Sequence, residues 1–339
     1  MKKASLKDIA QRVNCSLITV SRALNGRADD PHVSPKLREE IRKAAAELHY
    51  VQHRSARTLR LGRSRSIGLL ATSLCGHQHS CIIDALFKEC LKRGYQFKIV
   101  LTTYNKEQES HALEELLAES IDGIICQPEL DLDTPVVRHL AQEHFPMLLL
   151  GGPGKQNVFQ SIVSDMESFW DDVFTALIAR GHRKITVQGE ISDEQIAFYS
   201  ARYDIQIERV LQKDSRRSSL NGIYAQMSES NVKALVCLHT FDAQNYFYYQ
   251  MDRGRPLPDC IGVYSIPGEF FRHEKYLGAV VSDMKRYVEC CLDRMIFTLE
   301  HPGETPQKIV LDRKYLPIEQ LKVYQEKQLD DPWFSLYST

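Results

Sequence analysis

The stretch SLITVSRALN, residues 16–25, holds the side chains best suited to recognising another molecule. Arg22 carries a planar fork of donors that can pair with the two acceptors on a guanine edge, and Leu17 and Ile18 can pack against thymine methyl groups. Four neighbouring residues are suited to hydrogen-bonding phosphate oxygens: Ser16, Thr19, Ser21 and Asn25. These residue types favour sequence-specific binding to double-stranded DNA, if one helix presents them together.

Two short helices joined by a tight turn are predicted over residues 5–26. Ser5 and Asp8 have the spacing of a capping box. Apolar residues then recur every three or four positions and form one stripe on the first helix: Leu6, Ile9, Ala10 and Val13. Asn14 ends that helix, and Ser16 is suited to cap the next one.

The second helix is predicted to have an inward face that leaves the DNA-directed residues outside. Its inward residues are Val20, Ala23 and Leu24. A third helix is expected from Ser34 to about Tyr50, with Pro35 at its first position. The three helices make a helix-turn-helix headpiece. An ordinary helical pair in a protein core would show the same pattern, so the surrounding charge is needed to choose between the two readings.

Charge is distributed unevenly along the 339 residues. Residues 1–66 contain 15 Lys and Arg against 6 Asp and Glu, whereas residues 67–339 contain 28 against 38. A basic surface neutralises phosphates and releases counterions, and an acidic body is repelled by a duplex. The basic surplus lies on the predicted headpiece and therefore supports binding to DNA.

The composition, with 43% hydrophobic and 26% charged residues, is that of a globular protein. No apolar stretch approaches the ~20 residues that span a bilayer, and the basic N-terminus lacks the apolar run of a signal peptide. We therefore expect a cytoplasmic protein with no membrane partner, whose nine cysteines are reduced thiols.

Three stretches carry a family resemblance: DIAQRV followed by SLITVSRALNG, then VSPKLREEIRKAAAELHY, then SARTLRLGRSRSIGLL. Over residues 5–70 they resemble, almost continuously, the headpiece and hinge of the lac repressor (LacI/GalR) family of transcriptional regulators. In that family, the segment matching residues 53–60 folds on DNA into a hinge helix. Paired hinge helices from two subunits insert leucines into the minor groove.

The resemblance assigns roles to four residues of this hinge. Leu59 stands at the position of the inserted leucine, with Ala56 on the same face, and Arg54 and Arg57 are placed near phosphates. An apolar wedge of this kind unstacks a base step and bends the duplex. Just before the hinge, this sequence has Gln52 and His53 where the family usually has Pro and Asn.

From Ile67 onward, continuous apolar strands alternate with amphipathic helices, which is typical of parallel sheets covered on both faces. The expected fold is an all-α headpiece followed by an α/β two-lobed domain that resembles the periplasmic-binding-protein-like effector domain of the same family. The expected boundaries are 1–52 for the headpiece, 53–65 for the hinge, 66–320 for the effector-binding and dimerisation domain, and 321–339 for a C-terminal tail. Lobe 1 is assigned to about 66–162 and 279–305, and lobe 2 to about 163–278 and 306–320.

A small-molecule effector is expected in the interlobe cleft, outside the carboxyl ends of the strands. The candidate contacts are His77, His79, Arg202, Asp242 and Ser265. Arg202 is the nearest candidate for the family's sugar clamp, and Asp242 matches a typical position, but the family's hydroxyl-binding carboxylate is absent after CIGVY. The effector is therefore left open between a sugar and another small molecule.

A metal site is the alternative reading of the segment LCGHQHSC. Cys75, His77, His79 and Cys81 stand at alternate positions, so in an extended segment all four side chains would face one way. Cys and His suit Zn²⁺ or Cu⁺, but the spacing is not that of a zinc finger and four ligands on so short a strand would be strained. No metal or other cofactor is favoured, and a metal- or redox-responsive regulator stays as the alternative.

The favoured hypothesis is a homodimeric transcriptional regulator, acting as a repressor, that binds a pseudo-palindromic operator under control of an effector. A single headpiece reads only a few base pairs, so two are needed for useful specificity. We do not expect an enzyme, because the sequence contains no G-x-S-x-G, no H-E-x-x-H and no P-loop spacing. A small-molecule carrier with the same two-lobed fold is the remaining alternative, and DNA binding would distinguish the two.

Overall fold

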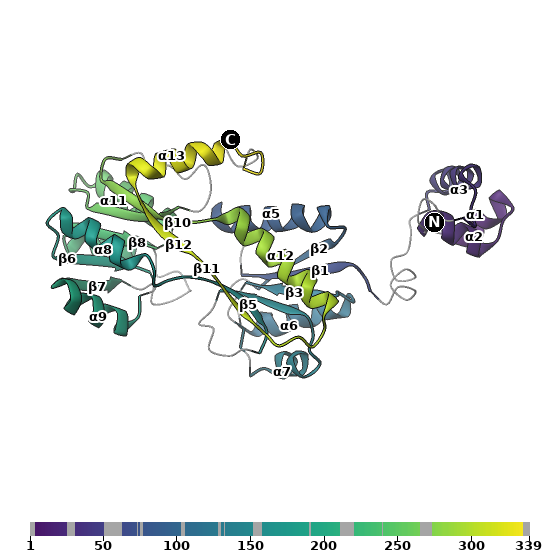
Figure 1. Ribbon diagram of the computed structural model, residues 1–339, viewed down its shortest axis with the longest axis horizontal. Coiled ribbons are helices and arrows are strands. Elements are labelled where there is room, and N and C mark those ends of the chain that lie inside the picture. The colour runs from purple at the N-terminus through teal and green to yellow at the C-terminus, as the bar shows by residue number, and fades with distance from the viewer. Residues whose placement is uncertain are drawn as a thin grey trace. The chain divides into compact units, whose positions relative to one another are not determined.

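A computed structural model describes most of the chain. The described residues are 4–25, 31–50, 63–72, 74, 77–102, 106–127, 130–131, 133–151, 158–189, 191–210, 220–238, 240–264 and 273–334. The chain divides into two compact units, Met1–Ser64 and Arg65–Thr339 (Figure 1). The predicted hinge residues Arg54, Ala56, Arg57 and Leu59 lie outside the described residues.

The described residues of the first unit contain three helices: α1 (Leu6–Val13), α2 (Leu17–Asn25) and α3 (Pro35–Glu47). The predicted capping box is present, because the Ser5 side chain accepts from the Asp8 amide and the Asp8 side chain accepts from the Ser5 amide. Asn14 ends α1 in the left-handed conformation, with φ of 52°. Ser34 caps α3 ahead of Pro35, as predicted. Local polar residues therefore fix where these helices begin and end.

The headpiece core contains one isoleucine or valine from each helix. Ile9 of α1, Val20 of α2 and Ile41 of α3 are all fully buried in one cluster. Arg12 of α1 also pairs with Glu47 of α3, with 2.6 Å between Nη2 and Oε2. This ion pair is exposed and adds little to stability, so apolar burial holds the three helices together.

The second unit begins with a six-stranded parallel sheet in the order β11-β5-β4-β3-β1-β2. Its strands are β1 (Ser66–Ala71), β2 (Gln96–Leu101), β3 (Gly123–Cys126), β4 (Met147–Leu150), β5 (Gln160–Ser164) and β11 (Lys308–Leu311). One face packs against α5 (His77–Lys92) and α12 (Met284–Glu300), and the other against α6 (Lys106–Ala118) and α7 (Pro135–Gln142). Ile67 and Leu69 face the first layer and Leu70 the second, because side chains alternate along a strand.

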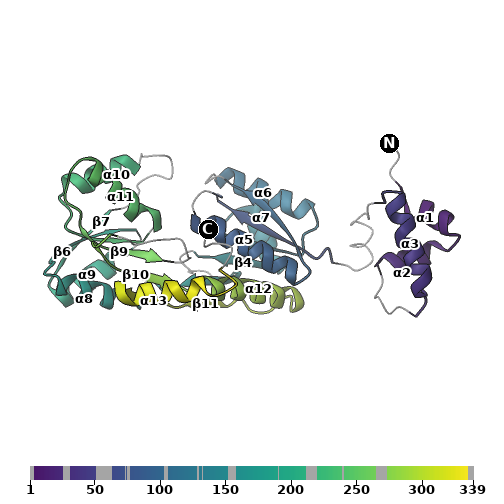
Figure 2. The same ribbon diagram turned by 90° about the horizontal axis from the view of Figure 1, so that it is seen from above.

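The second sheet has the order β12-β10-β9-β8-β6-β7, and only β12 runs antiparallel to its neighbour. Its strands are β6 (Lys184–Gln188), β7 (Gln206–Val210), β8 (Ala234–Cys237), β9 (Asp259–Tyr264), β10 (Tyr276–Ser282) and β12 (Arg313–Pro317). One face packs against α8 (Trp170–Ala179) and α9 (Asp193–Tyr203), and the other against α10 (Leu220–Glu229) and α11 (Thr240–Asp252). The last helix, α13 (Ile318–Leu329), contacts β10 and β12 (Figure 2).

Three segments connect the two sheets: residues 165–169, Asp283 and Asp312. The predicted two-lobed α/β fold is therefore present, but two lobe boundaries were wrong. Residues 279–282 were assigned to lobe 1, yet the whole of β10 pairs with β9 and β12 in the second sheet. Residues 308–311 were assigned to lobe 2, yet they form β11, which pairs with β5 in the first sheet. An apolar strand pattern indicates a strand without indicating which sheet takes it.

The sequence also left several elements unassigned. It predicted neither α9, β7 nor α10, and it treated residues 321–339 as a tail, although α13 occupies 318–329 and buries Leu321. Within the described residues, no helix is long and apolar enough to span a bilayer.

Candidate nucleic-acid interface

The N-terminus of α2 is fixed by the side chain of Ser16. Its Oγ accepts a hydrogen bond from the amide of Thr19 at 3.0 Å, and it lies 2.8 Å from the Thr19 hydroxyl. This satisfies one of the amides that a helix leaves unpaired at its first turn. Because Asn14 turns the chain sharply just before, α2 begins at a defined angle to α1, which is the geometry of a helix-turn-helix.

The outward face of α2 carries the predicted base-reading residues. Leu17 is 49% exposed and Ile18 is 68% exposed, although both are large and apolar. Arg22 is exposed one turn further along the helix. Val20 and Ala23 are buried, and Leu24 packs against the same core, as the sequence predicted. Two exposed aliphatic side chains beside an exposed arginine make a surface that can read base edges.

The other candidate DNA contacts of the headpiece are only partly described by the structure. Ser21 is partly buried on α2 and already takes part in an interaction within the protein. Asn25 is the last residue of α2, and its side chain lies outside the description. The basic residues are also not all available to phosphates, because Arg38 of α3 is only 5% exposed. Burial also raises the pKa of the Cys15 thiol, so this cysteine next to the turn is a packing group.

The carboxyl ends of the strands position part of the predicted effector site. His77 and His79 lie in the first turn of α5, which follows β1, and Asp242 lies in the first turn of α11, which follows β8. The side chains of these three residues lie outside the description, as does Ser265, which follows β9. Their places in the chain agree with ligand binding at the carboxyl edges of open α/β sheets.

Arg202 is not brought together with these candidates. It lies in the last turn of α9, which runs from the carboxyl end of β6 to the amino end of β7. Its guanidinium lies 3.5 Å from the Asp171 carboxylate and over the rings of Phe198 and Tyr203. Arg202 therefore packs at the opposite edge of the second sheet.

The extended geometry assumed for the alternative metal site was wrong. His77, His79 and Cys81 lie on the helix α5, so this part of the segment is not the extended strand on which alternate residues share one face. Cys81 is buried in the core of the first lobe, and Cys75 lies outside the described residues. Within the described part of the chain, no group of His, Cys, Asp and Glu could hold a metal ion.

Four buried polar atoms of the two lobes have no hydrogen-bond partner within the described structure, and three of them lie at the carboxyl ends of strands. They are Thr102 Oγ1 and Gln127 Oε1 in the first lobe, and Trp170 Nε1 and Ser282 Oγ in the second. Thr102 directly follows β2, Gln127 directly follows β3, and Ser282 ends β10. A buried polar group without a partner costs free energy, so the three atoms at the strand ends are suited to a hydrogen bond with a ligand. The sequence analysis missed all four, because a single polar residue after a strand gives no distinctive signal.

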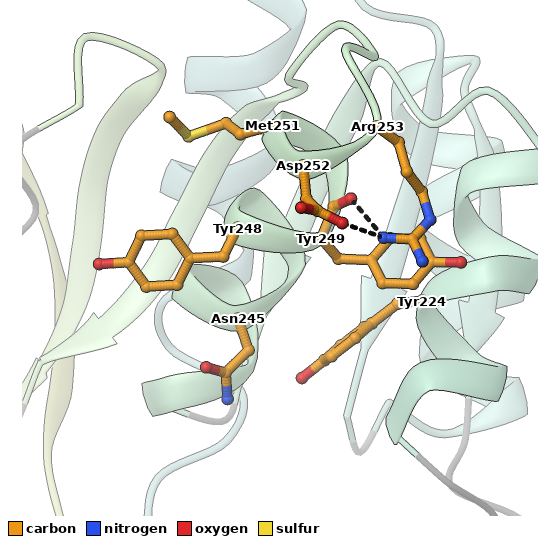
Figure 3. Close-up of a pocket in the computed structure, with 7 residues that line it drawn as sticks. All are labelled: Tyr224, Asn245, Tyr248, Tyr249, Met251, Asp252 and Arg253. Carbon is orange, nitrogen blue, oxygen red and sulfur yellow. Dashed lines mark hydrogen bonds and ion pairs between the residues drawn. The ribbon is translucent and has the colours of Figure 1, made fainter.

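A separate depression of about 760 Å³ lies at the end of α11. Figure 3 shows Tyr224, Tyr248, Tyr249 and Arg253 among its lining residues. The Arg253 guanidinium lies 3.8 Å from the centre of the Tyr249 ring and already uses that ring as a cation–π partner. Because α11 leads into the amino end of β9, this depression lies at the edge opposite to the expected effector site.

Residues 5–52 match the family model described as bacterial regulatory proteins, lacI family. This match covers the three-helix headpiece, which is similar to the headpieces of that family. A curated relative, the HTH-type transcriptional repressor PurR of Escherichia coli O139:H28, is 31% identical over 186 residues. That match covers 54% of this chain and 53% of PurR, so the chain spans about half the length of the curated relatives it matches.

Solved structures show a similar fold beyond the headpiece. The lac repressor dimer bound to operator and the anti-inducer ONPF superposes with a TM-score of 0.75 at 22% identity, over 93% of this chain and 98% of that one. The Cra regulator of Pseudomonas putida in complex with fructose 1-phosphate gives 0.64 at 17% identity, over 75% of this chain and 98% of that one. The expected two-lobed fold is thereby confirmed.

Proposed function

We propose that this chain is a sequence-specific DNA-binding transcriptional regulator that acts as a repressor. The observation that carries the proposal is the outward face of α2, where Leu17, Ile18 and Arg22 are exposed on a headpiece of the lacI family. Inserted into a major groove, Arg22 would pair with guanine, and Leu17 and Ile18 would contact thymine methyl groups. Ser16, Thr19, Ser21 and Asn25 would fix the register through phosphates.

The hinge, residues 53–65, is proposed to complete the grip on DNA. Leu59 would enter the minor groove with Ala56 behind it, while Arg54 and Arg57 contact phosphates. Two such hinges are needed to bend the duplex symmetrically, so the operator would be pseudo-palindromic and the regulator a homodimer. Such a regulator acts on DNA in the cytoplasm, and it carries out no enzymatic reaction.

An exposed apolar strip on the first lobe supports the dimer. Phe87 is 40% exposed and Leu91 is 50% exposed, one turn apart on α5. The Phe87 ring lies 6.5 Å from that of Phe97 on β2, and Leu101 at the end of β2 is also exposed. Contiguous exposed apolar residues mark protein interaction sites. We assign this strip to a second copy of the chain, because the lac repressor structure with this fold is a dimer.

A small-molecule effector is proposed at the carboxyl edges of the two sheets. The unpaired side chains of Thr102 and Gln127 in the first lobe, and of Ser282 in the second, would hydrogen-bond it. A ligand that joins both lobes has different affinities for different lobe arrangements and so shifts their populations. A thermal-shift screen of sugars and nucleosides would identify it, because a ligand of the native state raises the unfolding temperature.

Selection from a random-sequence duplex library tests the DNA proposal without knowledge of the operator. The wild-type chain should enrich a two-fold symmetric sequence. The triple variant Leu17→Ala, Ile18→Ala, Arg22→Ala should fold normally, because all three side chains are exposed, and should lose the enrichment. A wild-type library that stays random under every effector condition would exclude the proposed function.

A further inference from the structure

The C-terminal helix α13 packs on the second lobe. Leu321 is fully buried in a cluster with Tyr264 of β9, Val281 of β10 and Leu316 of β12. The Tyr264 hydroxyl donates a buried hydrogen bond to Gln328 Oε1 at 2.7 Å. These contacts join both ends of α13 to the second sheet, over which the helix lies in Figure 1.

The residues just after α13 pack on the other lobe. Phe334 is only 4% exposed and belongs to the core of the first lobe, together with residues of α5, α12 and β1. Trp333 packs against the same core, with its ring 4.6 Å from that of Phe334. Lys285 of α12 pairs with Asp331, with 3.0 Å between Nζ and Oδ2. The segment from α13 to Phe334 therefore contacts both lobes.

The backbone around Asp331 holds the two aromatic residues in place. Its Oδ1 accepts a hydrogen bond from the Trp333 amide at 2.9 Å, and its carbonyl accepts one from the Phe334 amide at 2.9 Å. One carboxylate thus fixes the turn and also pairs with Lys285 on the first lobe. The docked conformation is specific, because an aromatic pair, an ion pair and a fixed turn all require the same position.

We propose that residues 318–334 form a strap that docks Trp333 and Phe334 into the first lobe and thereby holds the two lobes in one arrangement. The covalent connections are short, since β10 joins α12 through Asp283 and β11 joins β12 through Asp312. Short connections of this kind let two lobes rotate as rigid bodies. The strap adds a non-covalent link outside these hinges, so any large change in lobe arrangement must first release Phe334.

This strap would set how much binding energy the effector must supply. A ligand shifts an equilibrium only by its differential affinity for the two states, and the docked strap favours the arrangement in which it fits. This consequence rests on the proposed function. The strap itself does not, because lobe movement can be measured in the absence of DNA and ligand.

Hydrogen exchange of the full chain tests the strap, with Phe334→Ala as the main variant. The Asp165 amide bonds to the Leu311 carbonyl at 2.8 Å, so exchange at this crossing reports on hinge opening. We expect exchange in residues 164–169 and 311–313 to become at least tenfold faster, while β6 and β8 of the second sheet exchange as in the wild type. Val323→Ala is the matched control, because Val323 lies on α13 but is 51% exposed.

Unchanged exchange at the crossing, with residues 331–334 themselves released, would overturn the proposal and leave these residues as surface packing. Should Phe334→Ala fail to fold, Asp331→Ala decides the question. It removes the ion pair and the side-chain hydrogen bond of the turn but keeps both aromatic rings. In this variant, exchange at the crossing should again be faster than in the wild type, by a smaller factor. Exchange at the wild-type rate would likewise contradict the proposal.

Discussion

The Ser16 hydroxyl accepts a hydrogen bond from the Thr19 amide at 3.0 Å and so begins α2 at the edge of its exposed face. Ser16→Ala should destabilise the headpiece by about 1 kcal/mol, the usual value of an N-cap. Ser34→Ala is a matched control, because Ser34 caps α3 in the same way and accepts from the Leu37 amide. Hydrogen exchange should show similar losses of stability in both variants. Selective DNA affinity should fall further in Ser16→Ala, and equal losses of affinity would argue against a phosphate contact from Ser16.

Two isoleucines of the headpiece should separate binding from stability. Ile18→Ala should leave stability within about 0.5 kcal/mol of wild type because the side chain is exposed, yet it should weaken binding to a selected site. Ile41→Ala should cost roughly 2–5 kcal/mol because Ile41 is fully buried. Denaturant unfolding and DNA titration of both variants check this. Full DNA affinity in Ile18→Ala would remove that residue from the interface.

Phe87→Glu should convert the proposed dimer into a monomer. A carboxylate at the centre of an apolar interface is left desolvated without a partner, which costs several kcal/mol. Phe198→Glu is the control, because Phe198 is also an exposed aromatic residue, 55% exposed on α9 of the other lobe. Analytical ultracentrifugation over a concentration series measures the outcome. A Phe87→Glu protein that dimerises like the wild type would place the interface elsewhere.

The ionisation of Asp259 should make the free energy of unfolding depend on pH in the acid range. Burial alone would raise the pKa of this carboxyl, but hydrogen bonds from His182 at 2.9 Å and Lys275 at 3.2 Å outweigh it and lower the pKa. A lowered folded-state pKa contributes stability above the ordinary value near 3.9, and this contribution is lost as pH falls below it. Urea midpoints should therefore drop on acidification in the wild type.

In Asp259→Asn, stability at neutral pH should be lower by roughly 1–3 kcal/mol, and the drop in acid should be shallower. Asp193→Asn is the control, because Asp193 pairs with Arg209 at 2.8 Å but its side chain is 85% exposed, where an ion pair adds little. Parallel acid profiles for wild type and Asp259→Asn would show that another carboxyl controls the acid limb.

The headpiece could be predicted almost completely because its signals are local. Ser5, Asp8 and Asn14 form the capping and terminating contacts that their spacing indicated, and the inward positions Val20 and Ala23 are buried. Most of the parallel strands were recognised by their continuous apolar runs, but β5 and β7 were not. A capping box at Ser192 and Gln195 also begins α9, and this signal was present in the sequence but not used.

Long-range arrangement explains what could not be predicted. No local pattern indicates that β10 joins the second sheet and β11 the first, because both read as buried strands. The sequence also does not show that Phe334 is buried in the first lobe although α13 packs on the second. Nor does it show that Thr102 Oγ1 has no hydrogen-bond partner within the described residues. The metal hypothesis assumed alternation on an extended segment, and that geometry was wrong because α5 begins at His77.

The central claim is that the outward face of α2 reads DNA sequence. The most direct test is the affinity of the full chain for a selected symmetric duplex, divided by its affinity for the same duplex scrambled, at one fixed salt concentration. We predict a ratio of about 10³ or more for the wild type. In Arg22→Ala, the free energy of discrimination that corresponds to this ratio should fall by roughly 1–3 kcal/mol per headpiece. The exposed cation Lys43 of α3 provides the control variant Lys43→Ala, whose ratio should stay near that of the wild type. A wild-type ratio near one, or a ratio unchanged by Arg22→Ala, would contradict the claim.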